Sequence, residues 1–445
     1  MNNTSPSCIP LYRASSGLVA AGALGTTVKS PSLLAAQGLA SGDFDPALIR
    51  MERFGLQSVV RDILPASPTA KCLRLRRRSE DGEAMGVSIW RAAESHTAHY
   101  KGLQTCASVW ACPVCSAKIS EKRRLEVAAA IAAHNADGGE VLLLTLTNRH
   151  HERDDLGNLV RGQLKALQYF MRGSKAAKKW FDSLGSIGTI RAFEITHQEA
   201  NGWHPHFHIL VFAKQGLDLA HLTNTGFDLW AQCCKLAKLK EPTRERGLRL
   251  ENGDRAAKYV GSWGLDYEVT KGHQKKAKTG GSSPFDLLRR VLADAKDGRA
   301  RQLFAEFARV FKGRRQLVWS RGLKARFAVE EKTDGDLAEG VVSGSELFAR
   351  LSTVQWRAVL RRDQSWGISI RGQLLELAGK NDRLRFDLLL DALAMKPHPS
   401  RDRGINRAVL PPGLCRESPC TASIPEGNAL GVGSGVAPPP IPYRH

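Results

Sequence analysis

The chain has 445 residues, enough for two or three domains whose cores need no disulfide framework. Lys and Arg outnumber Asp and Glu by 65 to 44, and the formal net charge of +21 favours a polyanionic partner, above all nucleic acid. No apolar run reaches the roughly 18 residues of a membrane span, and the run at 18–24 lacks the charged flank of a signal peptide. We therefore expect a cytoplasmic protein with no membrane partner.

The N-terminal part divides into an arm and a cysteine-rich module. Residues 1–65 are rich in Ser, Ala and Gly with weak periodicity, which predicts a poorly ordered arm with one short helix from Pro46 to Phe54. Residues 66–135 carry basic strand-like and turn-like pieces, then a cysteine cluster, then a stretch with helical spacing over 121–134.

The central region, residues 136–328, mixes strands with helices. An apolar β-rich run at 140–147 predicts a central strand. Two strand-like runs, 188–196 and 204–212, flank the turn signal Asn-Gly, which predicts an antiparallel hairpin. Helical patterns cover 156–184, as one or two helices, and then 219–238, 254–263 and 284–311. Strands mixed with helices, and neighbouring strands paired antiparallel, indicate an α+β fold.

The chain changes character after the central region. Residues 329–395 predict a helical C-terminal region, with helices over 343–362 and 369–394. Residues 396–445 are rich in Pro, Gly and Ser without apolar periodicity, which predicts a disordered tail.

Three cysteines lie close together in Cys106-Ala-Ser-Val-Trp-Ala-Cys112-Pro-Val-Cys115. This spacing suits tetrahedral coordination of a structural Zn²⁺ by thiolates, which needs a fourth ligand. Cys72 is the best candidate, since strand-like residues separate it from the cluster, and His96 or His99 are the substitutes. A redox Cys-x-x-Cys is the rival interpretation, but its usual βαβ setting is not apparent.

Three histidines alternate in Trp203-His-Pro-His-Phe-His208. Alternate side chains of a strand share a face, so His204, His206 and His208 point the same way, about 7 Å apart at neighbouring Cα positions. Across the predicted hairpin, an apolar match of the other faces places Glu194 on the histidine face. The pattern predicts a metal site of two histidines and one carboxylate, with His204 as a possible supporting residue.

Six tyrosines offer a hydroxyl nucleophile. Tyr12 and Tyr443 fall in the predicted disordered ends, Tyr100 precedes the cysteines, and Tyr169 belongs to an ordinary amphipathic helix. Tyr259 and Tyr267 remain. Tyr259 has small neighbours, follows a plausible N-cap at Asp254, and adjoins Lys258, which can contact phosphate.

The histidine run followed by Ile-Leu-Val resembles the motif of the HUH endonucleases, specifically the replication initiators of rolling-circle plasmids. Their upstream strand motif resembles Leu144–Thr147, and their tyrosine motif resembles Ala256–Gly264, in the same order along the chain. The segments Glu268–Lys271 and Thr279–Leu288 are also similar, and related initiators carry a cysteine where this chain has Cys72. The resemblance covers roughly residues 72–327.

This resemblance implies an HUH-type antiparallel sheet flanked by helices, in a bacterial cytoplasmic enzyme. It implies that Tyr259 attacks origin DNA with the help of Mg²⁺ or Mn²⁺, giving a 5′-phosphotyrosyl link and a 3′-hydroxyl primer. The implied partners are plasmid origin DNA, as a single-stranded loop and adjacent duplex, with a host helicase and DNA polymerase. Lys258 and Arg255 are the DNA-binding candidates beside the nucleophile.

Tyr267 lies eight residues after Tyr259, not the four expected of two-tyrosine relatives, so a mechanism with paired tyrosines is disfavoured. One departure from the family's pattern and two alternative functions remain. Some relatives carry a water-activating glutamate four residues before the tyrosine, where this chain has Arg255, so Asp254 or Glu251 would have to substitute. A relaxase or single-strand transposase would share the same chemistry. A non-catalytic, zinc-containing DNA-binding regulator would not.

Basic runs and tryptophans extend the expected DNA contacts. Together the basic runs can hold and steer phosphates: Arg74–Arg78, Lys118–Arg124, Lys175–Lys179, Lys235–Arg249, Lys271–Lys278 and Lys312–Arg315. Four tryptophans could stack on unpaired bases, although core packing is the more common role: Trp110, Trp180, Trp203 and Trp263.

Overall fold

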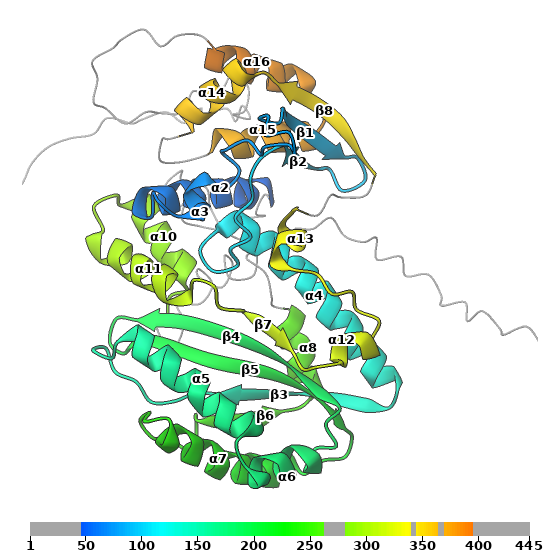
Figure 1. The fold of residues 1–445 in the computed structure, drawn as a ribbon, viewed down its shortest axis with the longest axis vertical. Coiled ribbons are helices and arrows are strands. Elements are labelled where there is room, and N and C mark those ends of the chain that lie inside the picture. The colour runs from blue at the N-terminus through cyan, green and yellow to red at the C-terminus, as the bar shows by residue number, and fades with distance from the viewer. Residues whose placement is uncertain (1–45, 262–280, 340–343, 364–368, 395–445) are drawn as a thin grey trace, which may run out of the picture. The chain divides into compact units, whose positions relative to one another are not determined.

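The computed structural model describes residues 46–261, 281–339, 344–363 and 369–394, and Figure 1 shows their arrangement. Strands and antiparallel pairing occur alongside helices throughout, which confirms the α+β class. The predicted N-terminal arm before residue 46, the C-terminal tail, Trp263 and Tyr267 lie outside the described residues.

A five-stranded antiparallel sheet forms the centre of the predicted catalytic region. Its strand order is β6-β3-β5-β4-β7. The strands are β3 (Gly139–Leu146), β4 (Gly188–Gln198), β5 (Gly202–Lys214), β6 (Leu248–Glu251) and β7 (Leu317–Trp319). The predicted hairpin is confirmed as β4 and β5, and Gly202 adopts a φ of 72° at the turn, where a Cβ atom would lie 2.8 Å from the backbone of Glu152.

The two faces of this sheet are covered by different helices. One apolar face packs into the larger core, beneath α5 (Leu156–Arg172) and α7 (Leu219–Leu236). The other face packs against α4 (Pro113–Ala136) and α8 (Gly253–Gly261), through residues such as Leu143, Leu210 and Phe212. Of the helices that complete this region, α6 (Lys175–Ser183) follows α5, and α10 (Pro284–Ala293), α11 (Gly298–Phe311), α12 (Leu323–Arg326) and α13 (Asp334–Glu339) follow α8 along the chain.

A second sheet joins segments from the two ends of the described chain. Its order is β2-β1-β8, built from β1 (Val87–Ala92), β2 (Thr97–Lys101) and β8 (Ser345–Leu351). It packs with α15 (Ile370–Gly379), which also contacts α2 (Pro46–Ile63). The remaining helices are α3 (Pro68–Lys71), α14 (Thr353–Arg362) and α16 (Arg383–Ala394).

Three local expectations differ from the structure. The helix expected to end at Phe54 continues to Ile63, because Leu56 and Val60 are fully buried and extend its apolar side. The helix expected over 343–362 is the strand β8 followed by α14, since pairing with β1 stabilises the extended conformation. The helix of Tyr259 begins at Gly253, so the side chain of Asn252, not Asp254, accepts a hydrogen bond from its first turn, at 3.4 Å from the nitrogen of Arg255.

Candidate metal and nucleophile site

The histidine face of β5 carries a metal-ligand arrangement with a carboxylate from β4. Glu194 lies directly opposite His206 in the strand register. Its Oε2 atom is 3.5 Å from Nε2 of His206 and 3.7 Å from Nε2 of His208. One donor atom from each of the three side chains lies within 4.8 Å of the others, so the group could hold a metal ion. The expected juxtaposition of Glu194, His206 and His208 is present.

Hydrogen bonds at the far nitrogens orient both imidazoles. Nδ1 of His206 lies 3.1 Å from the backbone oxygen of His204, which can only accept, so Nδ1 carries a proton and Nε2 is the nitrogen that faces Glu194. Nδ1 of His208 lies 2.9 Å from the hydroxyl of Thr145 on β3. Such partners fix the ring orientation of metal-binding histidines. Thr145 stands in the strand motif singled out above, but its contact with His208 was not anticipated.

His204 supports this group without joining it. Its ring stacks on that of His206 with centroids 5.0 Å apart, and its Nδ1 lies 2.7 Å from Nε2 of His150. His150 in turn donates from Nδ1 to the backbone oxygen of Asn201 at 2.8 Å. Burial, followed by the neighbouring imidazoles of His206 and His150, lowers the pKa of His204 to about 3. His150 was not anticipated, and its place in the loop that follows β3 was the one available signal.

Helix α8 brings Tyr259 to the same group. The hydroxyl of Tyr259 donates a short hydrogen bond to Oε1 of Glu194, and its ring centroid lies 4.5 Å from that of His208. The helix is anchored by Ala256 and Val260, which are buried against the sheet. Lys258 and Arg255 are exposed on α8, and Arg255 lies 3.4 Å from Glu251 in an ion pair.

The environment of Glu194 keeps it ionised. Burial alone would raise its pKa, but the imidazoles of His208 and His206 and the hydrogen bond from Tyr259 outweigh burial and lower the pKa to about 2. One carboxylate and two imidazoles form a donor set that suits a divalent transition-metal ion. The donor set therefore fits a divalent metal.

A second group of ligands consists of four cysteines. Cys72, Cys106, Cys112 and Cys115 bring their sulfur atoms within 4.8 Å of one another, so Cys72 joins the cluster, and His96 and His99 do not. Leu73 and Ala107, which follow two of these cysteines, adopt φ values of 51° and 48°, turning the chain sharply after each sulfur.

Hydrogen bonds and close sulfur neighbours surround the four cysteines. Gln57 donates to Cys112 at 3.2 Å, and Thr69 donates to Cys106 at 3.6 Å. The pKa of Cys72 is raised far above its usual range by the three neighbouring sulfurs and by burial. Four sulfurs within 4.8 Å of one another match the ligand set of a structural metal with tetrahedral thiolate coordination, so the cluster fits such a metal.

Other sequence candidates have structural roles. Trp110, Trp180 and Trp203 are buried, and Trp110 donates a hydrogen bond of 2.7 Å to the backbone of Arg314, so all three belong to the core. Tyr100 is buried and donates to the backbone of Arg371 at 2.9 Å. Among the described residues, no helix combines the length and apolarity needed to cross a bilayer.

Comparisons with known proteins place this chain in a family. "Protein rep" of Streptomyces lividans is 28% identical over 353 residues, which cover 63% of this chain and 77% of the relative. "Neomycin resistance protein" of Streptomyces cyanogenus is 32% identical over 133 residues, which cover 25% of this chain and 30% of that relative. No solved structure matches. The family described as Replication protein matches residues 99–363, more than half of the sequence, and the chain therefore belongs to that family of replication proteins.

Proposed function

We propose that this chain initiates rolling-circle replication of a plasmid by nicking one strand of origin DNA. The supporting observation is the hydrogen bond from the Tyr259 hydroxyl to Glu194, a carboxylate that also faces His206 and His208. A nucleophile next to a metal-ligand group is the arrangement that phosphoryl transfer to a side chain requires. The expected product is a 3′-hydroxyl primer for a host DNA polymerase, with strand separation by a host helicase in a bacterial cytoplasm.

In the proposed reaction, the Oη atom of Tyr259 attacks the scissile phosphorus. The Tyr259 O–P bond forms as the bond from phosphorus to the 3′-oxygen breaks, and the 5′-phosphate remains on the tyrosine. Tyrosine has an ordinary pKa of about 10, far above that of Glu194, so Glu194 cannot remove the proton in advance. Glu194 instead holds the hydroxyl in place, and the net transfer moves its proton through solvent to the departing 3′-oxygen.

Glu194, His206 and His208 would hold the divalent metal, Mg²⁺ or Mn²⁺. When bound, it polarises the scissile phosphate and offsets the negative charge that develops on its oxygens. His204 and His150 keep His206 in place, and Thr145 does the same for His208. Lys258 and Arg255, both exposed on the helix of Tyr259, are available to contact the phosphates of the bound strand.

The four-cysteine cluster would hold a structural Zn²⁺. The four protein sulfurs would fill all four ligand positions of a tetrahedral ion and leave no open position for a substrate. Its proposed role is to tie the segment of Cys72 to the start of α4, where Cys112 is the residue before the first helical turn.

A nicking assay tests this proposal. The wild-type protein is incubated with Mn²⁺ and a supercoiled plasmid that carries the DNA flanking this coding sequence. We expect a relaxed circle and a covalent protein–DNA adduct from the wild type and from the control Tyr169→Phe, and neither product from Tyr259→Phe. Wild-type adduct from Tyr259→Phe would refute the assignment of the nucleophile. No adduct from any of the three proteins would favour the non-catalytic regulator.

The comparisons favour an initiator over a relaxase or transposase, because the matching family is one of replication proteins. The plasmid used in the nicking assay can also distinguish an initiator from a transposase. An initiator supports replication of the circle from the nick site, whereas a transposase cleaves at the ends of an inserted element.

A further inference from the structure

One side of α14 is cationic and exposed. Arg357, Arg361 and Arg362 are exposed, and the helix contains no acidic residue. None of the three has a carboxylate partner among the described residues. At the start of the helix, Arg76 reaches across from an N-terminal segment and donates to the hydroxyl of Thr353 at 3.2 Å. Arginines from two distant parts of the sequence therefore meet at one helix.

Arg357 and Arg361 lie on the side of α14 that faces away from the core residues Trp356 and Val359. Trp356 and Val359 are buried, at 3% and 0% exposure. At 100° per residue, Arg357 and Arg361 lie within about 40° of each other and point away from these two core residues. About one helical turn, roughly 6 Å along the axis, separates the two arginines, so both can face the same phosphate backbone.

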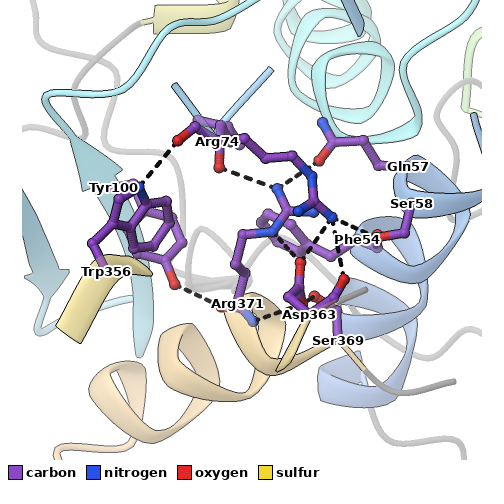
Figure 2. Close-up of polar contacts among 10 residues, drawn as sticks. Phe54, Gln57, Ser58, Arg74, Tyr100, Trp356, Asp363, Ser369 and Arg371 are labelled. Atoms are coloured by element: carbon purple, nitrogen blue, oxygen red, sulfur yellow. Dashed lines mark hydrogen bonds and ion pairs between the residues drawn. The ribbon is translucent and has the colours of Figure 1, made fainter. Parts of the chain in front are cut away.

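A buried polar network fixes the orientation of α14 (Figure 2). Asp363, the residue that caps its C-terminal end, accepts from Arg74 at 3.0 Å and from Arg371 at 2.5 Å. The Asp363 and Arg371 side chains are fully buried. Near the other end of the helix, the indole of Trp356 donates to the backbone oxygen of Arg74 at 3.0 Å and packs on Tyr100 with ring centroids 5.5 Å apart.

Further contacts tie this network to helix α2. Gln57 accepts from Arg371 at 2.7 Å, Ser58 accepts from Arg74 at 2.9 Å, and the hydroxyl of Ser369 donates to Asp363 at 2.5 Å. Buried ion pairs add little net stability compared with apolar packing, but they impose one geometry on the groups that they connect. The helix is thus held rigidly at both ends while its arginine side stays open to solvent.

We propose that this arginine side of α14, extended by Arg76, binds the phosphate backbone of duplex DNA next to the strand that is nicked. The proposal rests on the proposed function, which supplies DNA as the partner. A rigid row of unpaired arginines fits a duplex, whose phosphates are regularly spaced. It offers no aromatic side chain on the exposed face for stacking on the bases of a single strand.

Equilibrium binding at several salt concentrations tests the proposal. The probes are a fluorescent duplex of about 30 base pairs and a single strand of the same length, since each lost phosphate contact changes the salt dependence by about one unit of slope. For Arg357→Gln/Arg361→Gln we expect the slope of log Kd against log salt for the duplex to fall by about two, and duplex affinity to fall roughly tenfold. Single-strand affinity and the Tyr259 adduct on a single-stranded substrate should not change.

Two further variants make the result decisive. Lys380→Gln/Arg385→Gln also removes two exposed positive charges, from the end of α15 and from α16, and should keep the wild-type slope. Arg357→Lys/Arg361→Lys retains both charges and should restore duplex binding. An unchanged slope in the glutamine variant, or an equal fall in the charge-matched control, would overturn the proposal. Neither result involves Tyr259. Absence of the adduct with the wild-type protein would refute the proposed function, and the duplex-binding measurements would still test the DNA contact of α14.

Discussion

The hydroxyl of Tyr259 donates to one oxygen of Glu194, while the other oxygen of the same carboxylate faces the two histidines. One side chain therefore links the candidate nucleophile to the candidate metal ligands. Two constraints produce this link: the register of β4 against β5 sets the position of Glu194, and burial of Ala256 and Val260 sets the position of α8. A change at Glu194 should affect both functions of the site.

Glu194→Gln removes the negative donor and leaves a neutral amide in its place. We expect Mn²⁺ affinity to fall by at least tenfold, because the two remaining imidazoles are neutral and offset none of the charge of the ion. Titration calorimetry with Mn²⁺ measures this affinity, and adduct yield should fall in parallel. The control is Glu199→Gln, which neutralises an exposed carboxylate beyond the end of β4. Equal Mn²⁺ affinity in both variants would count against Glu194 as a ligand.

Thr145→Val removes the hydroxyl that contacts Nδ1 of His208 and keeps the shape of the side chain. Loss of such a supporting contact lowers metal affinity by about tenfold or more, since the ring becomes free to rotate. We expect weaker Mn²⁺ binding together with an unfolding temperature close to that of the wild type. Unchanged Mn²⁺ affinity would show that packing alone orients His208. A large loss of thermal stability would mean that the hydroxyl has a mainly structural role.

The sequence predicted that Glu194, His206 and His208 would lie together because a strand has a strict period of two. Alternation places His206 and His208 on one face, and the Asn-Gly turn sets the register that brings Glu194 opposite His206. Strand alternation and the turn signal were sufficient to predict this juxtaposition because the two strands follow each other in the chain. Tyr259 was selected by its motif, and its contact with Glu194 follows from the packing of α8, which no local pattern reveals.

Contacts between distant segments could not be read from the sequence. Leu347, Phe348 and Leu351 have the spacing of a helix, yet they form part of β8 because β1 supplies its hydrogen-bonding partner. Arg74 belongs to a run that predicts a solvated, phosphate-binding surface, whereas the structure buries it against Asp363, 289 residues away. Such pairs depend on tertiary packing that overrides local propensity.

Cys72→Ser should abolish the structural metal. Serine cannot supply a thiolate, and three sulfurs hold zinc much less firmly than four. We expect one zinc per wild-type chain by elemental analysis, in addition to any metal at the histidine site, and none in the variant. Unfolding should occur at a lower temperature. The control is Cys233→Ala, which removes a buried thiol outside the cluster and should retain the zinc. Full zinc content in Cys72→Ser would assign the fourth position to another ligand.

Asp363→Asn tests the network that holds α14 (Figure 2). It leaves Arg74 and Arg371 buried without their shared anion, which typically costs about 3–5 kcal/mol in the free energy of unfolding. Urea denaturation measures the change. The control Asp387→Asn breaks an exposed ion pair with Arg383 and should cost less than about 1 kcal/mol. Similar costs for both variants would mean that the network does not stabilise the fold as we describe.

His99 should make the protein less stable in mild acid. Its two ring nitrogens are buried without a hydrogen-bond partner among the described residues. Burial, followed by the charges of Lys118 and Lys101, lowers its pKa from 6.5 to about 4. Between these two pH values the unfolded chain binds more protons at this residue than the folded chain does. The contribution of His99 to the free energy of unfolding is therefore fully present above pH 6.5 and is lost as the pH falls towards 4.

His99→Gln removes the titrating group, so its free energy of unfolding should fall less than that of the wild type when the pH is lowered from 7 to 5. Because His99 is partly exposed to solvent, we expect a difference of only about 1 kcal/mol. Urea titrations at the two pH values measure it. The control His221→Gln alters an exposed histidine on α7 and should follow the wild type. An identical pH response in His99→Gln and the wild type would show that the imidazole of His99 can be protonated in the folded chain as easily as in the unfolded one.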